Sequence, residues 1–232
     1  MISHCLGVPA LARRYESAVD LTATLERDPS RLVADHLDYE VFGEIFAPAY
    51  WPRLRLLLLI RHPLDALISN FYKRYADDLL PDRSQSIKLN LQRFLRGEFD
   101  RMAIREVVRR TPLFATTYAE YLRRFALGWY RTRGVRIIRY EDLVVNTRDE
   151  LSQIMKFLGT KVTTDKIEEA VTLYSFECLS GGRSAGESDV MSHYRNGVPG
   201  EWLAFLEDRD IEAAHERVGD IVSALGYSLR RA

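Results

Sequence analysis

The sequence is poor in the features that mark secreted, metal-binding and membrane-spanning proteins. Among 232 residues it holds two cysteines, Cys5 and Cys178, which lack the spacing of a metal site. A disulfide between them has no support, so a protein in a reducing compartment is the simpler interpretation. No apolar run is long enough to span a bilayer, and residues 1–16 lack the charged start and long apolar centre of a signal peptide. We therefore expect a cytoplasmic protein with no membrane association.

The sequence also has no excess of positive or negative charge. Lysine and arginine total 33, aspartate and glutamate total 33, and the formal net charge is zero. Bulk electrostatics therefore gives no case for binding nucleic acid. A GxxxxGK[ST] loop is also absent, which disfavours a nucleotide-dependent phosphotransferase. What remains is an ordinary globular composition, with 47% hydrophobic and 28% charged residues, which suits a single domain over residues 1–232.

Expected strands and helices alternate along the chain. This order predicts an α/β fold in three layers, with a parallel sheet covered by helices on both faces. Strands are expected at residues 31–34, 54–60 and 135–139, and helices at residues 10–27, 39–48, 112–131 and 208–225. A further helix is expected to begin with a capping box at residues 147–150 and to end at Gly159, and another to begin at Asp165. Residues 180–200 are rich in Gly and Ser and carry no period, which is typical of either disorder or a mobile ligand-binding segment.

Residues 53–75 are the most informative stretch. A solid apolar run up to Ile60 stops at Arg61 and Pro63, and helical periodicity follows at once. The pattern predicts a buried strand, a short turn and an amphipathic helix with proline at its first position. Arg61 would then lie beside the N–H groups at the helix start, and Ser69 adds a hydroxyl donor, which together suit an anion such as phosphate. Taken alone, a structural Arg61 that pairs with a neighbouring carboxylate is an equally good interpretation.

Other candidate side chains follow the expected strands, where ligands of parallel sheets bind. His36 follows strand 31–34 and could act as a general base, although a lone histidine is more often a packed or surface residue. Tyr140 follows strand 135–139. Tyr140 and Phe176 are candidates for contacting a planar ring of a ligand. Core packing is the alternative for Phe176.

Arginines bracket the Gly-rich segment. Arg195 is followed by Asn196 and Gly197, so a fork of donors stands beside flexible backbone, an arrangement that suits a phosphate clamp. The alternative is a mobile surface arginine, which is the preferred interpretation of Arg183.

Taken together, these motifs resemble the sulfotransferases that use 3′-phosphoadenosine-5′-phosphosulfate (PAPS). Residues 61–65, RHPLD, with Ser69 resemble the family's 3′-phosphate motif, and residues 140–142, YED, resemble its YED strand end. Residues 175–177, SFE, are similar to a segment that contributes an aromatic side chain to the adenine site. Residues 195–202, RNGVPGEW, are similar to the RKGxxGDW motif. The matches fall in the family's order, which is more specific than any one of them.

The resemblance implies a role for each residue. PAPS would be the co-substrate and 3′-phosphoadenosine 5′-phosphate (PAP) the product, with no metal. The 3′-phosphate would be held by two motifs that contribute Arg61, Ser69, Arg195, Asn196 and Gly197. Tyr140 and Phe176 would contact the adenine, and His36, which matches the position of the catalytic base, would deprotonate a hydroxyl or amine of a small-molecule acceptor. Asn196 stands where the family prefers Lys, which removes one charge from the phosphate clamp.

One family feature has no match in this sequence. The family opens with a strand and a PKSGT-like loop that wraps the 5′-phosphosulfate, whereas residues 1–7 look like the end of the helix that follows that loop. We therefore expect the sulfotransferase fold, which is like that of P-loop nucleotide hydrolases, without its first strand and loop. Two hypotheses follow: a PAPS-dependent sulfotransferase, or a truncated or non-catalytic relative that binds the nucleotide without turnover. The acceptor and the oligomeric state, monomer or homo-oligomer, stay open.

Overall fold

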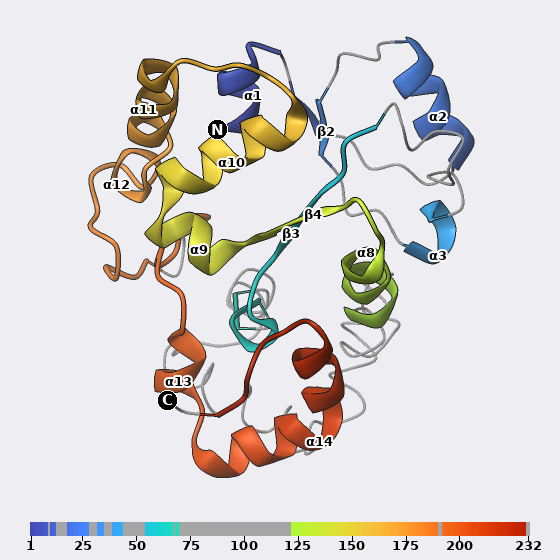
Figure 1. Ribbon diagram of the computed structural model, residues 1–232. Helices are drawn as coiled ribbons and strands as arrows, with labels where there is room; N and C mark the ends of the chain where they lie inside the picture. The colour runs from blue at the N-terminus through green and yellow to red at the C-terminus, as the bar shows by residue number, and fades with distance from the viewer. Residues whose placement is uncertain are drawn as a thin grey trace. The chain divides into compact units, whose positions relative to one another are not determined.

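The computed structural model describes residues 1–8, 10–12, 18–27, 32–34, 39–43, 54–66, 68–69, 122–189 and 192–230 (Figure 1). The chain forms two compact units. Unit 1 consists of Met1–Ile60 and Arg124–Gly182, and unit 2 consists of Arg61–Arg123 and Arg183–Ala232. Whether both belong to one domain, as the sequence predicts, stays a prediction.

Two parallel strands lie side by side in unit 1. β3 (Leu57–Ile60) pairs with β4 (Arg136–Arg139), in a register that sets Ile60 opposite Arg139 (Figure 1). Both strands and the parallel arrangement of the sheet were predicted from the sequence and are confirmed, whereas the pairing of these two strands was not predicted. Because Ile60 and Arg139 are partners, the chain leaves both strands at the same end, and the next residues along it are Arg61 and Tyr140.

A second parallel pair lies near the N-terminus. β1 (Ala10–Ala12) pairs with β2 (Leu32–Ala34), so the strand expected at residues 31–34 is confirmed. The helix expected over residues 10–27 is wrong at residues 10–12, which form β1, and is confirmed at α2 (Ala18–Arg27). The Ala-Leu-Ala stretch has a high intrinsic helix propensity, which pairing with a strand later in the chain overrides.

Three helices share the hydrophobic core of unit 1. They are α1 (Ile2–Leu6), α10 (Thr147–Leu158) and α11 (Thr164–Leu173). Their buried residues, with one from β4, are Cys5, Ile138, Leu151, Ile154, Met155, Ile167 and Ala170. α10 ends as predicted at Gly159, whose φ of 74° is in the left-handed region that favours glycine.

The capping box predicted at residues 147–150 is wrong. The Thr147 hydroxyl donates a 2.7 Å hydrogen bond to the carbonyl of Leu143 and accepts no N–H of its own helix. Leu143 belongs to α9 (Tyr140–Val145), which runs into α10 with only Asn146 between them. The carbonyl one turn back is therefore within reach of the threonine hydroxyl.

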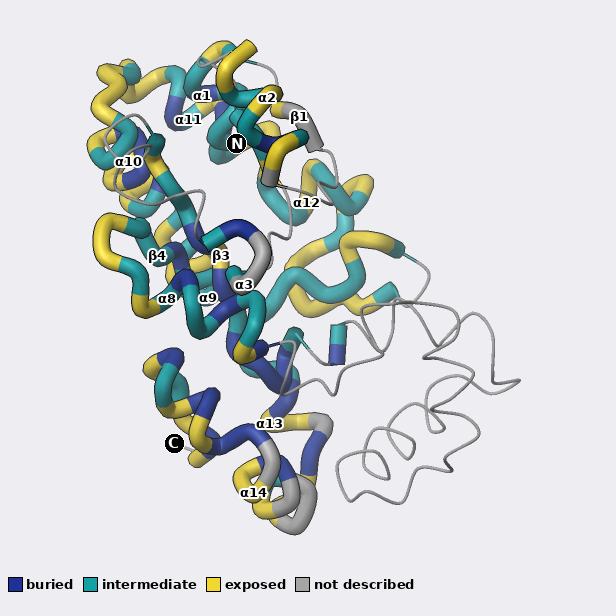
Figure 2. The backbone as a smooth tube through the Cα atoms, turned by 90° about the vertical axis from the view of Figure 1, so that its right-hand side faces the viewer, coloured by how far each residue is buried: buried dark blue, intermediate teal, exposed yellow. Residues whose placement is uncertain are grey.

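Unit 2 has a core of its own. Residues 63–66 and 68–69 are helical, which confirms the helix expected after β3, and two helices follow late in the chain, α13 (Glu201–Phe205) and α14 (Asp208–Ala224). The buried residues of this core come from these helices, with Leu206 just after α13 and Leu229 after α14. They are Leu64, Ile68, Trp202, Leu206, Ala214, Val218, Val222 and Leu229. Buried positions recur every three or four residues along α14, at Ala214, Val218, Ile221 and Val222, as expected of an amphipathic helix (Figure 2).

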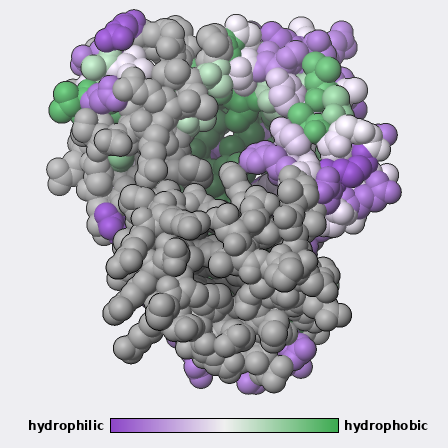
Figure 3. Space-filling view, turned by 180° about the vertical axis from the view of Figure 1, so that it is seen from behind, coloured by the Kyte–Doolittle hydropathy of each residue, from purple (hydrophilic) through white to green (hydrophobic). Residues whose placement is uncertain are grey.

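Short elements make up the rest of the described chain. They are α3 (Tyr39–Phe42), the π-helical turn η3 (Leu122–Leu127), α8 (Gly128–Arg131) and α12 (Phe176–Leu179). Hydrophobic and hydrophilic residues are interspersed on the described part of the face in Figure 3. Every helix among the described residues is too short or too polar to cross a lipid bilayer.

The two cysteines differ in environment, which gives a first prediction. Cys5 is 2% exposed in the core of unit 1 and burial raises the pKa of its thiol, whereas Cys178 is exposed. Because the thiolate is the reactive form, we expect iodoacetamide to label Cys178 at least about tenfold faster than Cys5 in the folded protein. Peptide mapping by mass spectrometry measures both rates, with the urea-unfolded chain as the control in which they converge. Equal rates in the folded protein would show that Cys5 is not buried.

Candidate 3′-phosphate site

The strand-end arginine of the sequence motif lies at the first residue of unit 2. Arg61 follows β3 directly and its side chain is 21% exposed. Its Nη2 atom lies 3.9 Å from Oδ2 of Asp65, one helical turn later. Arg61 therefore has the neighbouring carboxylate that the structural interpretation required, and that carboxylate also orients its guanidinium.

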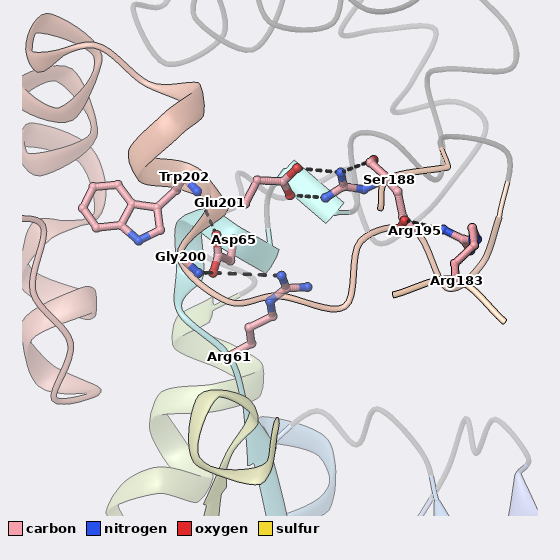
Figure 4. A network of polar contacts seen from close by, with 8 residues as sticks. All are labelled: Arg61, Asp65, Arg183, Ser188, Arg195, Gly200, Glu201 and Trp202. Atoms are coloured by element: carbon pink, nitrogen blue, oxygen red, sulfur yellow. Dashed lines mark hydrogen bonds and ion pairs between the residues drawn. The ribbon is translucent and has the colours of Figure 1, made fainter. Parts of the chain in front are cut away.

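Asp65 connects this helix start to a distant segment (Figure 4). Its side chain is fully buried, its Oδ2 accepts the backbone N–H of Gly200 at 2.6 Å, and its Oδ1 accepts that of Trp202 at 2.9 Å. Gly200 is the N-cap of α13 with φ 82°, a conformation that glycine adopts without strain but that provides no side-chain oxygen. Asp65 provides that oxygen, so it caps a helix that begins far along the chain.

Arg195 is paired with the first residue of the same helix. Its Nη1 donates to Oε1 of Glu201 at 2.6 Å and its Nη2 donates to Oε2, a bidentate pair. The side chains of Arg195 and Glu201 are 9% and 14% exposed. Since arginine uses the same fork for carboxylate and for phosphate, Glu201 occupies the donors that the sequence assigns to phosphate.

The Gly-rich segment that carries Arg195 is held together by hydrogen bonds. The Arg183 guanidinium donates at 2.5–3.0 Å to three backbone carbonyls, those of Glu187, Tyr194 and Arg195. A backbone bond of 2.8 Å also joins the N–H of Gly186 to the carbonyl of Asn196. The interpretation of Arg183 as a mobile surface side chain is therefore wrong. Whether this segment moves to cover a ligand stays a prediction.

His62 also packs against α13, through Trp202. Its ring stacks on that of Trp202, with centroids 4.7 Å apart and an interplanar angle of 7°. The backbone N–H of Leu64 lies 3.3 Å from its Nδ1, and the carbonyl of Ser228 lies 3.1 Å from its Nε2. Since Leu64 donates, Nδ1 is the acceptor and Nε2 carries the proton that bonds to Ser228. His62 is 7% exposed and works as a packed residue of the core.

The remaining predicted residues lie in both units. Ser69 is half-buried on the helix after β3, and Gly197 has φ 72° within the Gly-rich segment. Tyr140 and Phe176, both half-buried, begin α9 and α12 in unit 1. His36 lies outside the described residues. Contacts of these five residues with a nucleotide stay predictions, as does the absence of a metal.

The chemistry of unit 2 at this point suits an anion. Two arginines from separate sequence motifs are attached to one short segment, residues 200–202: Arg61 through Asp65, and Arg195 through Glu201 (Figure 4). Guanidinium forks recognise phosphate groups as well as carboxylates, so both arginines are candidates for holding a phosphate.

Comparison with known families identifies the chain. The family model described as "Sulfotransferase domain" matches residues 8–226. The chain belongs to this family. Sulfotransferase 2A2 of Mus musculus is 21% identical over 198 residues, 81% of this chain and 62% of the relative. The 3-alpha-hydroxysteroid sulfotransferase of Cavia porcellus is 22% identical over 188 residues, 76% of this chain and 58% of the relative. This sulfotransferase domain thus spans 58–62% of the length of these relatives.

Solved structures show the same fold. Mouse sulfotransferase SULT7A1 complexed with PAP superposes with a TM-score of 0.57 at 20% identity, covering 93% of this chain and 77% of that one. Retinol dehydratase in complex with androsterone and inactive cofactor PAP gives a TM-score of 0.58 at 20% identity, covering 91% of this chain and 58% of that one. The prediction of an α/β sulfotransferase fold is therefore confirmed.

Sequence reasoning missed Asp65, Glu201 and His62 as parts of the site. A signal was present for the first of them. It is a weak one: Gly200 is an N-cap without a side-chain oxygen, so the first N–H groups of α13 need an acceptor from another segment or from solvent, and the sequence does not say which.

Proposed function

We propose that this sulfotransferase domain moves a sulfuryl group from PAPS to a hydroxyl or amine of a small-molecule acceptor, leaving PAP. The observation that carries the proposal is the polar network of unit 2, in which the arginines of two family motifs are attached to the same short segment. Membership of the sulfotransferase family and the PAP bound in two structural neighbours support it.

The donors present fit the 3′-phosphate of such a nucleotide. Arg61 and Arg195 would neutralise its charge, and Ser69 with the backbone of Asn196 and Gly197 would add neutral donors. A phosphate would bond to N–H groups of Arg195 other than the two that Glu201 accepts, since a guanidinium has five donors, and Glu201 would keep the side chain in place. Tyr140 and Phe176 would contact the adenine, a role that rests on the family resemblance.

The transfer itself asks mainly for positioning and for cations against developing charge. A bond forms from the acceptor oxygen or nitrogen to sulfur while the bond from sulfur to the 5′-phosphate oxygen breaks, and the electron pair of that bond leaves with PAP. The acceptor's proton would go to His36, again by resemblance.

The names of relatives guide the choice of acceptor and compartment. A hydroxysteroid sulfotransferase, and retinol dehydratase bound to androsterone, favour an apolar alcohol as the acceptor. Both cysteines of this chain are free, which is compatible with the reducing cytoplasm that we propose as its location.

The proposal is tested by binding and by turnover on the same preparation. We expect isothermal titration calorimetry to show saturable binding of PAP and weaker binding of 5′-AMP, which lacks the 3′-phosphate. Incubation with PAPS and a panel of steroid, retinoid and phenol alcohols and of amines should yield a sulfated product detected by mass spectrometry. A chain that binds PAP no better than 5′-AMP and sulfates nothing in the panel would contradict the proposed function.

A further inference from the structure

Asp65 stands out among the buried polar groups of unit 2. Its side chain is 0% exposed, and no catalytic or ligand-binding role falls to it in the function proposed above. Burying a carboxylate costs several kcal/mol before its partners are counted, and apolar replacements of buried ion pairs are often neutral or stabilising. A carboxylate at this position therefore calls for a reason beyond packing.

The partners of Asp65 provide that reason. Each oxygen has its own backbone donor, Gly200 for Oδ2 at 2.6 Å and Trp202 for Oδ1 at 2.9 Å, and Oδ2 also faces the Arg61 guanidinium at 3.9 Å. The side chain thus fixes a cation of one motif and the main chain of another at the same time (Figure 4).

The effect of this attachment extends to the second arginine. Glu201 lies between the two pinned amides, and its carboxylate accepts both Nη atoms of Arg195. The backbone that Asp65 fixes is therefore the backbone that orients the partner of Arg195. Moving residues 200–202 would move Arg195 relative to Arg61.

We propose that Asp65 is the positioning residue of the 3′-phosphate site, which sets the placement of Arg61 and Arg195 relative to each other. This inference rests on the proposed function, because it assumes that the two arginines bind the 3′-phosphate. Asp65 itself touches no nucleotide atom in this role.

The substitution Asp65→Asn tests the role with little change of shape. An asparagine offers one acceptor oxygen, and its amide group would face the remaining backbone N–H as donor against donor, so one of the two bonds is lost. We expect the preference for PAP over 5′-AMP, measured by calorimetry as the ratio of the two dissociation constants, to fall about tenfold. Binding of 5′-AMP should change little, since it lacks the group that the arginines hold.

The control is Asp220→Asn, the same change at a carboxylate of unit 2 that pairs with Arg123 at 3.1 Å with 69% of its side chain exposed. It should leave the PAP to 5′-AMP ratio unchanged. If Asp65→Asn lowers the melting temperature but keeps the wild-type ratio, Asp65 only stabilises the fold and the inference fails. If the wild-type protein itself shows no preference for PAP, the proposed function fails instead, so the two failures are distinguishable.

Hydrogen exchange on the wild-type protein covers the case in which Asp65→Asn does not fold. The amides of Gly200 and Trp202 should exchange slowly, and PAP should slow them further because a bound 3′-phosphate tightens the segment that they anchor. Exchange of both amides at unprotected rates, or rates that PAP leaves unchanged while it binds, would overturn the inference.

Discussion

Replacing Arg61 by alanine is expected to weaken PAP binding about 100-fold, the largest binding effect that the site predicts. Arg61 leaves a strand end, faces Asp65 at 3.9 Å and offers a forked donor at the start of a helix. Truncating a charged group that bonds to a phosphate removes about 2–5 kcal/mol, and each 1.4 kcal/mol is a factor of ten. The PAP affinity of Arg61→Lys should lie between those of the wild type and Arg61→Ala, because lysine keeps the charge but loses the forked pair of donors.

The matched control for this prediction is Arg123→Ala. Arg123 is also an arginine of unit 2 beside an aspartate, but its side chain is 47% exposed and its partner is Asp220. PAP affinity of Arg123→Ala, measured by calorimetry, should equal that of the wild type. An Arg61→Ala protein that folds and binds PAP within about threefold of the wild type would remove Arg61 from the site.

The largest effect on stability is expected from Trp202→Ala. Trp202 is 4% exposed, stacks on His62 at 4.7 Å and belongs to the core that also contains Leu64 and Ile68. Removing a buried indole typically lowers the free energy of unfolding by about 3–5 kcal/mol, through lost burial and the cavity left behind. Urea unfolding followed by circular dichroism measures the change.

Two variants frame that result. Trp202→Phe keeps an aromatic ring against His62, so it should lower the free energy of unfolding by clearly less than Trp202→Ala does. Leu203→Ala changes the next residue of α13, whose side chain is 39% exposed, and should alter the free energy of unfolding by less than about 1 kcal/mol. Equal losses for Trp202→Ala and Leu203→Ala would mean that the His62–Trp202 stack contributes nothing specific to unit 2.

Local patterns predicted the elements that local forces determine. The apolar run before Arg61 and the helical spacing of Leu64 and Ile68 gave the strand–turn–helix that the structure describes, and Gly159 ended α10 where its backbone freedom is needed. The β1 segment was mistaken for helix, because only pairing with β2 makes Ala-Leu-Ala a strand.

The arginines of the candidate site could be predicted from the sequence, whereas the carboxylates that pair with them could not. Arg61 and Arg195 stand in recognisable motifs, whereas nothing near Asp65 in the sequence announces that its partners are the backbone amides of Gly200 and Trp202. The same holds for Glu201, whose position just after a glycine reads as an ordinary acidic residue in the first turn of a helix. Partners far apart in sequence come from tertiary structure, which a single sequence does not encode in any short pattern.

The anchoring of α13 has a consequence for how the chain folds. Five residues are too few for a helix to persist on its own, and the carboxylate that caps this one lies 135 and 137 residues away from the amides that it accepts. His62 and Ser228 close a still longer loop, of 166 residues. Such closures are entropically costly and come late, after the nearer contacts have formed. We therefore expect the loop that carries Arg195 to acquire its shape only after the two ends of unit 2 have met.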